Sequence, residues 1–304
     1  MSVNFHFVNV GYGDCTIVHW PKRTVGQKSK NERIMMVDLY HHEGHDEYDN
    51  VIEYYKANFR NEDGTLKPIF RFVCTHPHQD HICGLKKLLD DDEIRILNFW
   101  DSEHSFVPED FDGHETHEED WNAYKNLGGS ESSVTVIKTK RSDKPRQFWD
   151  EDGDKITVLS PSDALIQKAH ETEDGKKREK VEIDEMSYAL SIKINSRSVI
   201  LAGDGRTSPV WNDIFENCKD DLKSCAVLKA GHHGHECSFH EESLKEMDPQ
   251  IIIFSNSKSE DKNNGAGSDY KRVCPKATIY KTFEGTTVVK VPFDGDKDIF
   301  VEAL

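Results

Sequence analysis

The stretch THPHQDH, residues 75–81, decides how this chain is interpreted. Four metal-ligand side chains fall within six of its residues, namely His76, His78, Asp80 and His81. Imidazole nitrogens and carboxylate oxygens are common ligands of divalent cations in proteins. A single tight turn places all four side chains together, so that His76 and His78 can bind one metal while Asp80 and His81 bind a second. Two metals about 3.5–4 Å apart are typical of hydrolases, where they stabilise both the attacking and the leaving oxygen.

The residues on either side of this stretch predict a strand, a turn and a helix. The apolar run FRFVC at 70–74 is typical of a buried strand, and GLKKLL at 84–89 is typical of a helix start. The chain has 16 histidines, but chance clustering does not explain this order of ligands directly after an apolar strand. We therefore predict a dinuclear metal-dependent hydrolase.

Composition narrows the class of protein. The 304 residues carry a net charge of −17 and seven cysteines without a C-x-x-C spacing. We expect one domain spanning residues 1–304, reduced thiols, a cytoplasmic location and no membrane segment. A strongly acidic chain repels polyphosphate at long range. The charge therefore argues against a broad nucleic-acid surface, and it fits a nucleotide or single-stranded substrate, or a protein partner with a basic surface.

Apolar patterns predict a mixed α/β chain with two sheets and helices outside them. The expected strands cover residues 3–10, 15–20, 34–38, 70–74, 91–100, 133–138, 155–159, 188–194, 198–202, 226–229 and 251–255, and the expected helices cover 50–58, 209–217 and 240–246. Residues 162–180 are expected to be a charged helix or an exposed insertion.

Polar segments between these elements are expected to be loops. Residues 21–33 are predicted as a basic loop and residues 256–268 as a polar loop, and the segments 277–283 and 286–291 are predicted to pair as the last two strands. A further loop at 41–49 carries three histidines that we expect at the surface, His41, His42 and His45.

Four motifs in this order resemble the metallo-β-lactamase superfamily. They are FVNVGYGD at 7–14, THPHQDH at 75–81, SYAL at 187–190 leading to LAGD at 201–204, and LKAGHHG at 228–234. More narrowly, the chain resembles the hydrolase domain of competence-type (ComEC-like) DNA-uptake proteins and the phosphorylcholine esterases. The resemblance covers nearly the whole chain and implies an αββα sandwich of two mixed sheets with outer helices and metals at one edge.

The resemblance also implies roles for further residues. Asp204 would bridge both metals, and His233 or His232 would complete the second site, with His233 preferred. The other histidine would donate a hydrogen bond to a substrate oxygen. Asp80 would position the attacking hydroxide and act as a base. Lys229 would add positive charge beside the substrate, unless its head lies in water.

Other positions complete or depart from the family pattern. Asp38 would orient a ligand histidine, and Asp14 would do the same or cap the first hairpin. His104 is the candidate for a third ligand of the first metal. The sequence departs from the pattern at His235, where a serine is usual, and at residues 263–273, which lack the usual His-Pro. The ligand types suit two divalent ions, zinc first and manganese as the alternative, with no organic cofactor.

The resemblance implies a phosphodiesterase or nuclease that cleaves phosphodiester bonds with a metal-bridging hydroxide. The same chemistry serves a lactone, a β-lactam or a thioester, which is the second hypothesis. A third hypothesis is a partner-gated effector or a regulatory subunit of a toxin or defence complex. The acidic segments 101–120 and 150–185 motivate this last hypothesis.

Overall fold

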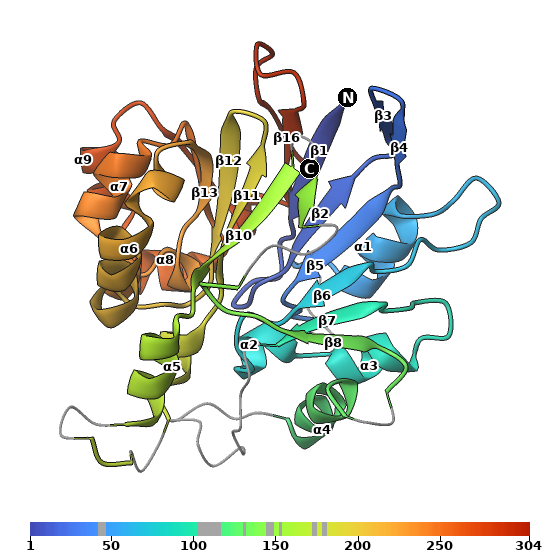
Figure 1. Cartoon of the computed structure of the whole chain (residues 1–304), viewed down its shortest axis with the longest axis horizontal. Coiled ribbons are helices and arrows are strands. Elements are labelled where there is room, and N and C mark those ends of the chain that lie inside the picture. The colour runs from blue at the N-terminus through green and yellow to red at the C-terminus, as the bar shows by residue number, and fades with distance from the viewer. Residues whose placement is uncertain are drawn as a thin grey trace.

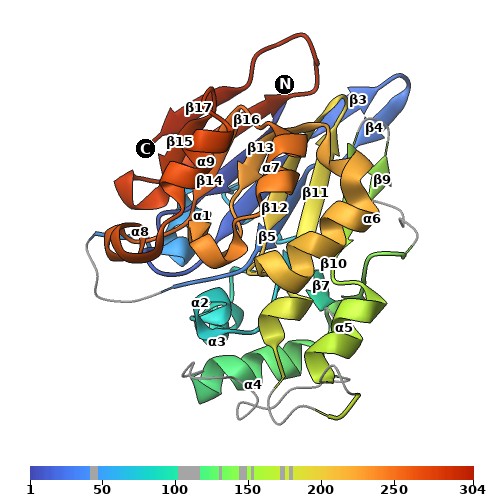
Figure 2. The same cartoon turned by 90° about the vertical axis from the view of Figure 1, so that its left-hand side faces the viewer.

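Two large β-sheets lie face to face, and helices cover their outer sides (Figures 1 and 2). The computed structural model describes residues 1–41, 47–101, 117–129, 132–143, 149–151, 154–171, 175–177 and 181–304. The four layers of helix, sheet, sheet and helix confirm the expected α/β sandwich.

The first sheet has eight strands and mixes both strand directions. Its order is β17 (Phe300–Ala303), β16 (Thr287–Pro292), β1 (Ser2–Phe7), β2 (Thr16–Trp20), β5 (Arg33–Val37), β6 (Arg71–Val73), β7 (Asn98–Asp101) and β8 (Thr135–Lys138). The strands β5 to β8 run parallel, and the remaining pairs are antiparallel. Parallel neighbours place the carboxyl ends of β5 and β6 at one edge of the sheet, where the predicted metal ligands begin.

The second sheet has seven strands and repeats this arrangement. Its order is β15 (Thr278–Lys281), β14 (Ile251–Phe254), β13 (Cys225–Lys229), β12 (Arg197–Ala202), β11 (Ala189–Ile194), β10 (Asp154–Ser160) and β9 (Asp150–Glu151). The strands β12 to β15 are parallel, whereas β9 to β12 pair antiparallel. The motifs at 201–204 and 228–234 therefore leave neighbouring parallel strands at the same edge.

Alternation along the strands explains why both faces of each sheet are buried. In β5, Met35 and Val37 face the second sheet, while Ile34 and Met36 face the helices on the outer side. A side-chain period of two produces this division between the faces. Strands buried on both faces consist of nearly continuous apolar residues, which is why their alternation is hidden in the sequence.

Helices cover the outer faces of both sheets. The first sheet packs against α1 (Val51–Asn58), α3 (Leu85–Asp90) and α4 (Glu118–Leu127). The second packs against α6 (Asn212–Leu222), α7 (Glu241–Met247) and α9 (Gly267–Val273). A short helix, α5 (Asp163–His170), forms part of the segment predicted as charged helix or insertion.

Three local expectations were wrong. The predicted basic loop at 21–33 contains a small hairpin of β3 (Arg23–Val25) and β4 (Lys28–Lys30). The predicted polar loop contains helix α8 (Lys258–Asn264), whose start is stabilised by a capping box between Ser257 and Glu260. The strands β15 and β16 do not pair, because β15 joins β14 in the second sheet and β16 joins β1 in the first. The two strands are adjacent in sequence, which suggested a hairpin, but in the folded chain each one pairs with a strand of a different sheet.

Two further findings concern the whole described chain. None of its helices combines the length and the apolar character that crossing a membrane requires. All seven cysteines lie in the described ranges, and each one is a free thiol.

Candidate metal centre

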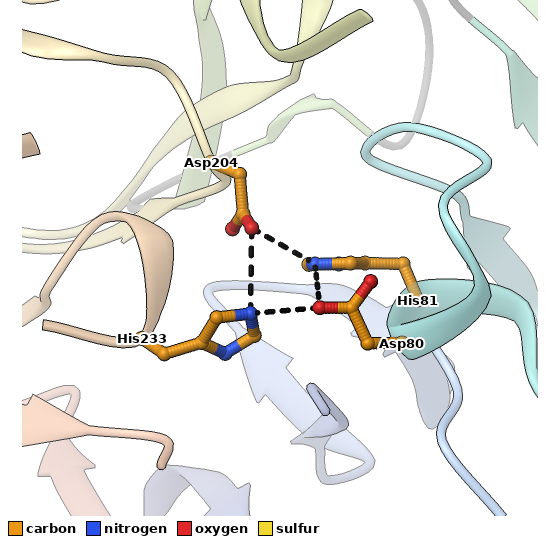
Figure 3. Close-up of side chains that lie close together, drawn as sticks. All are labelled: Asp80, His81, Asp204 and His233. Atoms are coloured by element: carbon orange, nitrogen blue, oxygen red, sulfur yellow. Dashed lines mark hydrogen bonds and ion pairs between the residues drawn. The ribbon is translucent and has the colours of Figure 1, made fainter. Parts of the chain in front are cut away.

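Four of the predicted ligands meet where the two sheets adjoin (Figure 3). Asp80 and His81 belong to the short helix α2 (Gln79–Ile82) that follows β6, Asp204 follows β12, and His233 lies in the turn η4 (His232–Gly234) that follows β13. The Nε2 atom of His233 is 3.1 Å from Asp80 Oδ2 and 3.3 Å from Asp204 Oδ2. The Nε2 atom of His81 is 3.2 Å from Asp204 Oδ2 and 3.8 Å from Asp80 Oδ2. Residues more than 120 positions apart thus form one ligand group.

The other ligand group consists of His76, His78 and Asp184. We call it the first ligand group, because it contains the two histidines predicted to bind the first metal. The group of Asp80, His81, Asp204 and His233 is the second ligand group. The Nε2 atom of His76 is 2.9 Å from Nδ1 of His78. The Oδ1 atom of Asp184 is 3.4 Å from Nδ1 of His78 and 3.8 Å from Nε2 of His76. His76 and His78 thus lie together in the first ligand group, and Asp80 and His81 lie together in the second.

Asp184 is the ligand candidate that the sequence reasoning missed. It lies in the 3-10 helix η2 (Ile183–Met186), directly before the SYAL motif. No local spacing connects it with the histidines, and an acidic, charged segment surrounds it. Its position just upstream of a recognised motif was the one available signal. The candidate proposed from sequence for this place, His104, lies outside the described residues.

Buried oxygens without partners show that these groups fit divalent cations. Within the described chain, the Oδ1 atoms of Asp80, Asp184 and Asp204 are buried and accept no hydrogen bond. A buried carboxylate oxygen without a partner is costly, so such atoms call for an explanation. A cation held by each group would supply the missing contact. The mixed histidine and carboxylate donors suit zinc, manganese or iron.

Asp38 holds one ligand ring from behind, as the sequence predicted. Its Oδ2 lies 2.9 Å from Nδ1 of His81, which turns the Nε2 of that ring toward Asp80 and Asp204. The carboxylate is itself fixed, because the backbone amide and the hydroxyl of Thr75 donate to it at 2.7 and 2.8 Å. Such partners set the tautomer and the orientation of metal-binding histidines.

The HHG turn has a strained backbone. His232 and His233 have φ angles of 47° and 57°, and Gly234 follows with 86°. Positive φ costs non-glycine residues roughly 1–3 kcal/mol each and is concentrated at functional sites. The turn aims the two imidazoles differently. Nδ1 of His233 donates to the carbonyl of Ser255 at 2.9 Å, which leaves its Nε2 as an acceptor for a cation.

His232 lies beside the second ligand group and is not a member of it. Its Nε2 is 3.8 Å from Asp204 Oδ2, and its Nδ1 is 3.1 Å from the sulfur of Cys237. The side chain remains 27% exposed, in contrast to 6% for His233. This difference supports His233 as the ligand and leaves His232 accessible to a substrate.

Burial and opposing charges shift the pKa values in the centre. Burial alone lowers the pKa of His81, but the carboxylates of Asp204, Asp38 and Asp80 raise it well above its ordinary value. Burial lowers the pKa of His76 well below its ordinary value, and the neighbouring imidazoles of His81 and His78 lower it further. His76 is therefore neutral and able to donate its lone pair to a cation.

Lys229 is not where the sequence reasoning expected it. Its side chain is 3% exposed, and its ammonium forms a buried ion pair with Asp14 and donates to the carbonyl of Ala202 at 3.2 Å. The lysine therefore neither reaches a substrate nor lies in water. Its contact gives Asp14 a defined role, because the turn after β1 is held against β13 by this pair.

An open cleft of about 180 Å³ borders the second ligand group. Helix α8, which replaces part of the expected loop, forms one side of it. The lining residues are Asp80, His232, His233, Gly234, His235, Asn256, Glu260, Asn264 and Gly265. His235, which departs from the family pattern, thus faces the cleft.

His41 is buried, contrary to the expected surface position, while His42 and His45 lie outside the described residues.

Comparisons with known proteins identify the fold. No family model and no curated protein sequence matches the chain. Among solved structures, the chain is similar to Igni18, a novel metallo hydrolase from the archaeon Ignicoccus hospitalis, with a TM-score of 0.52 and 12% sequence identity. That match covers 100% of both chains. The match to yeast PDE1 has a TM-score of 0.51 and 12% sequence identity, and it covers 96% of this chain and 100% of PDE1.

A third neighbour is larger than this chain. CmlA, a diiron beta-hydroxylase from Streptomyces venezuelae, matches with a TM-score of 0.51 and 11% identity. All of this chain is covered, but only 54% of CmlA. At such low identity these likenesses establish the architecture, while the chemistry has to be derived from the residues at the site.

Proposed function

We propose that this chain, which has the metallo-β-lactamase fold and two adjacent ligand groups, is a dinuclear metal-dependent hydrolase that cleaves phosphodiester bonds. One observation carries the proposal. The groups His76–His78–Asp184 and Asp80–His81–Asp204–His233 lie at the carboxyl ends of parallel strands, and the second opens onto a cleft. In this proposal each group would hold one cation, and Asp204 would serve as a ligand of both, as the family resemblance implies.

When bound, the two cations supply Lewis acidity and lower the pKa of a coordinated water. The chain supplies orientation and proton transfer. Asp80 has a side chain that is 27% exposed at the cleft, and its Oδ2 contacts His233, so it is placed to accept a proton from a nucleophilic water. His232 faces the same cleft and is placed to donate a hydrogen bond to the developing oxyanion.

Substrate class rests on two supports. Yeast PDE1, a phosphodiesterase by name, has the same architecture. The motifs also resemble those of competence-type proteins, which favours a phosphodiester bond as the bond that is cleaved. Membership of that narrower group stays a prediction. The net charge of −17 opposes an extended polyanion, so we propose a nucleotide or a short single strand as substrate.

The test compares hydrolysis of bis(p-nitrophenyl) phosphate and of labelled single-stranded DNA with zinc or manganese. The variants are wild type, Asp80→Asn and the control Asp163→Asn, whose carboxylate is 71% exposed and pairs with Lys140. We expect metal-dependent turnover that is lost in Asp80→Asn and retained in the control.

The outcomes separate the alternatives. Turnover of the DNA that weakens steeply with salt indicates a nuclease, whereas salt-insensitive turnover of the small diester indicates a small substrate. If two bound metals are verified and neither phosphodiester is cleaved, the proposal is wrong. Hydrolysis of a lactone, β-lactam or thioester by the same preparation would then identify the carbonyl alternative.

A further inference from the structure

Arg206 lies two residues after Asp204, in the loop that leaves β12. Its Nε atom donates to Oδ2 of Asp184 at 3.1 Å. The other oxygen of that carboxylate faces His76 and His78. Asp184 therefore lies between the two histidines of the first ligand group and the guanidinium, and Arg206 contacts the metal centre through this one carboxylate.

The guanidinium has donors left over. In the described chain, its contact with Asp184 uses Nε alone, and the side chain is 51% exposed while that of Asp184 is 7% exposed. Arginine offers five N–H donors in a planar fork, so the contact through Nε leaves the four donors on the two terminal nitrogens unused by Asp184. A guanidinium that is anchored at Nε and open at its fork is pre-organised to bind a tetrahedral oxyanion in a bidentate manner.

The loop that carries Arg206 is fixed against the HHG segment. The hydroxyl of Thr207 donates to the carbonyls of Cys237 and Phe239 at 2.9 and 2.8 Å. Cys237 in turn contacts Nδ1 of His232 at 3.1 Å. Arg206 and His232 therefore lie on segments that are tied to one another by these contacts.

Charge makes this arginine distinctive within the described centre. The ligand groups and the residues that support them contain five carboxylates, those of Asp14, Asp38, Asp80, Asp184 and Asp204. The ammonium of Lys229 is already paired with Asp14. Among the described residues, Arg206 is the exposed cation that contacts a carboxylate of either ligand group. A negatively charged substrate entering this acidic surrounding gains a fixed counter-charge there.

We propose that Arg206 is an anion-recognition residue, whose terminal nitrogens bind the non-bridging oxygens of the substrate's phosphoryl group beside the His76–His78–Asp184 group. The inference rests on the proposed function for the identity of the anion. It goes beyond that function by assigning the phosphate subsite to one side chain and by placing it next to the first metal rather than in the cleft beside the second.

The probe is inorganic phosphate, titrated calorimetrically into zinc-loaded protein. The variants are wild type, Arg206→Gln, Arg206→Lys and the control Arg272→Gln, an arginine 54% exposed that pairs with Glu241 and Asp269 away from the centre. Hydrogen bonds to charged groups are worth about 1.5–3 kcal/mol, so Arg206→Gln should weaken phosphate roughly 10- to 100-fold. Arg206→Lys should recover part of the loss, because it keeps the charge without the fork.

Zinc content, measured by mass spectrometry, separates recognition from support. We expect an unchanged zinc content in Arg206→Gln, because Asp184 keeps its Oδ1 toward His76 and His78. If that variant loses zinc, Arg206 acts by holding Asp184 and the proposal is overturned. An equal affinity for phosphate in Arg206→Gln and wild type, or no phosphate binding by wild type, overturns it as well.

Failure of the proposed function gives a different result. If phosphate binding depends on Arg206 but neither phosphodiester is hydrolysed, the anion subsite stands and the reaction assignment fails. If phosphodiesters are hydrolysed with the same KM and kcat in Arg206→Gln, the reaction stands and the subsite fails.

Discussion

At the scale of single residues, the centre combines ligands that one motif predicts with one that no motif predicts. His76, His78, Asp80 and His81 lie within six residues, and the turn after β6 necessarily brings them together. Asp184 is contributed by a segment more than 100 residues later. Its Oδ1 is buried without a hydrogen bond, which makes it the most informative carboxylate to change.

We predict that Asp184→Asn removes one metal and leaves the other. The amide is a weak ligand without the negative charge that offsets burial of the cation, so the first group would retain only two imidazoles. Zinc content should fall from two ions toward one per chain, measured after extensive dialysis, while Asp163→Asn retains both. Two tightly held ions in Asp184→Asn would show that this carboxylate is not a ligand.

At the scale of elements, the turn between β1 and β2 is a structural support of the centre. The amide of Asp14 donates to the carbonyl of Asp80 at 3.0 Å, and the hydroxyl of Ser255 donates to the carbonyl of Gly13 at 3.2 Å. A Cβ added to Gly13 would lie 2.2 Å from the ring of Tyr40 and 2.5 Å from the carbonyl oxygen of Asp80. The glycine in GYGD therefore permits a close backbone approach that keeps Asp80 in place.

We predict that Gly13→Ala destabilises the fold and disturbs metal binding together. Overpacking of this kind costs about 1–3 kcal/mol or more, and here the atom met is partly backbone, which cannot rotate away. Gly267→Ala is the matched control, since the nearest atom to its added Cβ is 3.7 Å away. Urea unfolding and zinc content should both change in Gly13→Ala, and equal values for the two variants would contradict this account.

At the scale of the whole molecule, the two sheets are joined at the ligand edge by charge as well as by the apolar layer between them. Asp14 follows β1 of the first sheet, and Lys229 ends β13 of the second. Their ion pair is buried, with 4% and 3% of the side chains exposed. Removing one partner of a buried pair leaves an uncompensated charge, which typically costs about 3–5 kcal/mol.

We predict that Lys229→Met strongly lowers the free energy of unfolding and that Lys229→Met/Asp14→Leu restores much of it. The double variant replaces both charges with apolar groups, so no unpaired carboxylate stays buried. Urea unfolding in the presence of a chelator measures this separately from metal binding. Lys223→Met, which breaks the exposed pair with Asp220, should change little. If the double variant is less stable than the single one, the pair contributes in another way.

Features of the fold and of the candidate site could be predicted from the sequence where neighbouring residues determine them. They could not be predicted where residues far apart in the chain determine them. Apolar runs, the turn residues and the ligands at 75–81 are local properties, so the sheets, most of the helices and most of both ligand groups could be predicted. The helix α8 could not, because its capping box outweighed a composition typical of loops. Neither could the separation of β15 from β16, since each strand completes a different sheet.

The sequence by itself determined the architecture and the ligand types, because apolar runs and ligand motifs each consist of residues that are neighbours in the chain. Only the tertiary structure decided which distant side chains share a ligand group. It brought Asp184 to His76 and His78, selected His233 over His232, and turned Lys229 inward to Asp14. The physical reason is that buried charges and imidazoles settle where other parts of the fold supply a partner, and no local pattern in the chain encodes that partner.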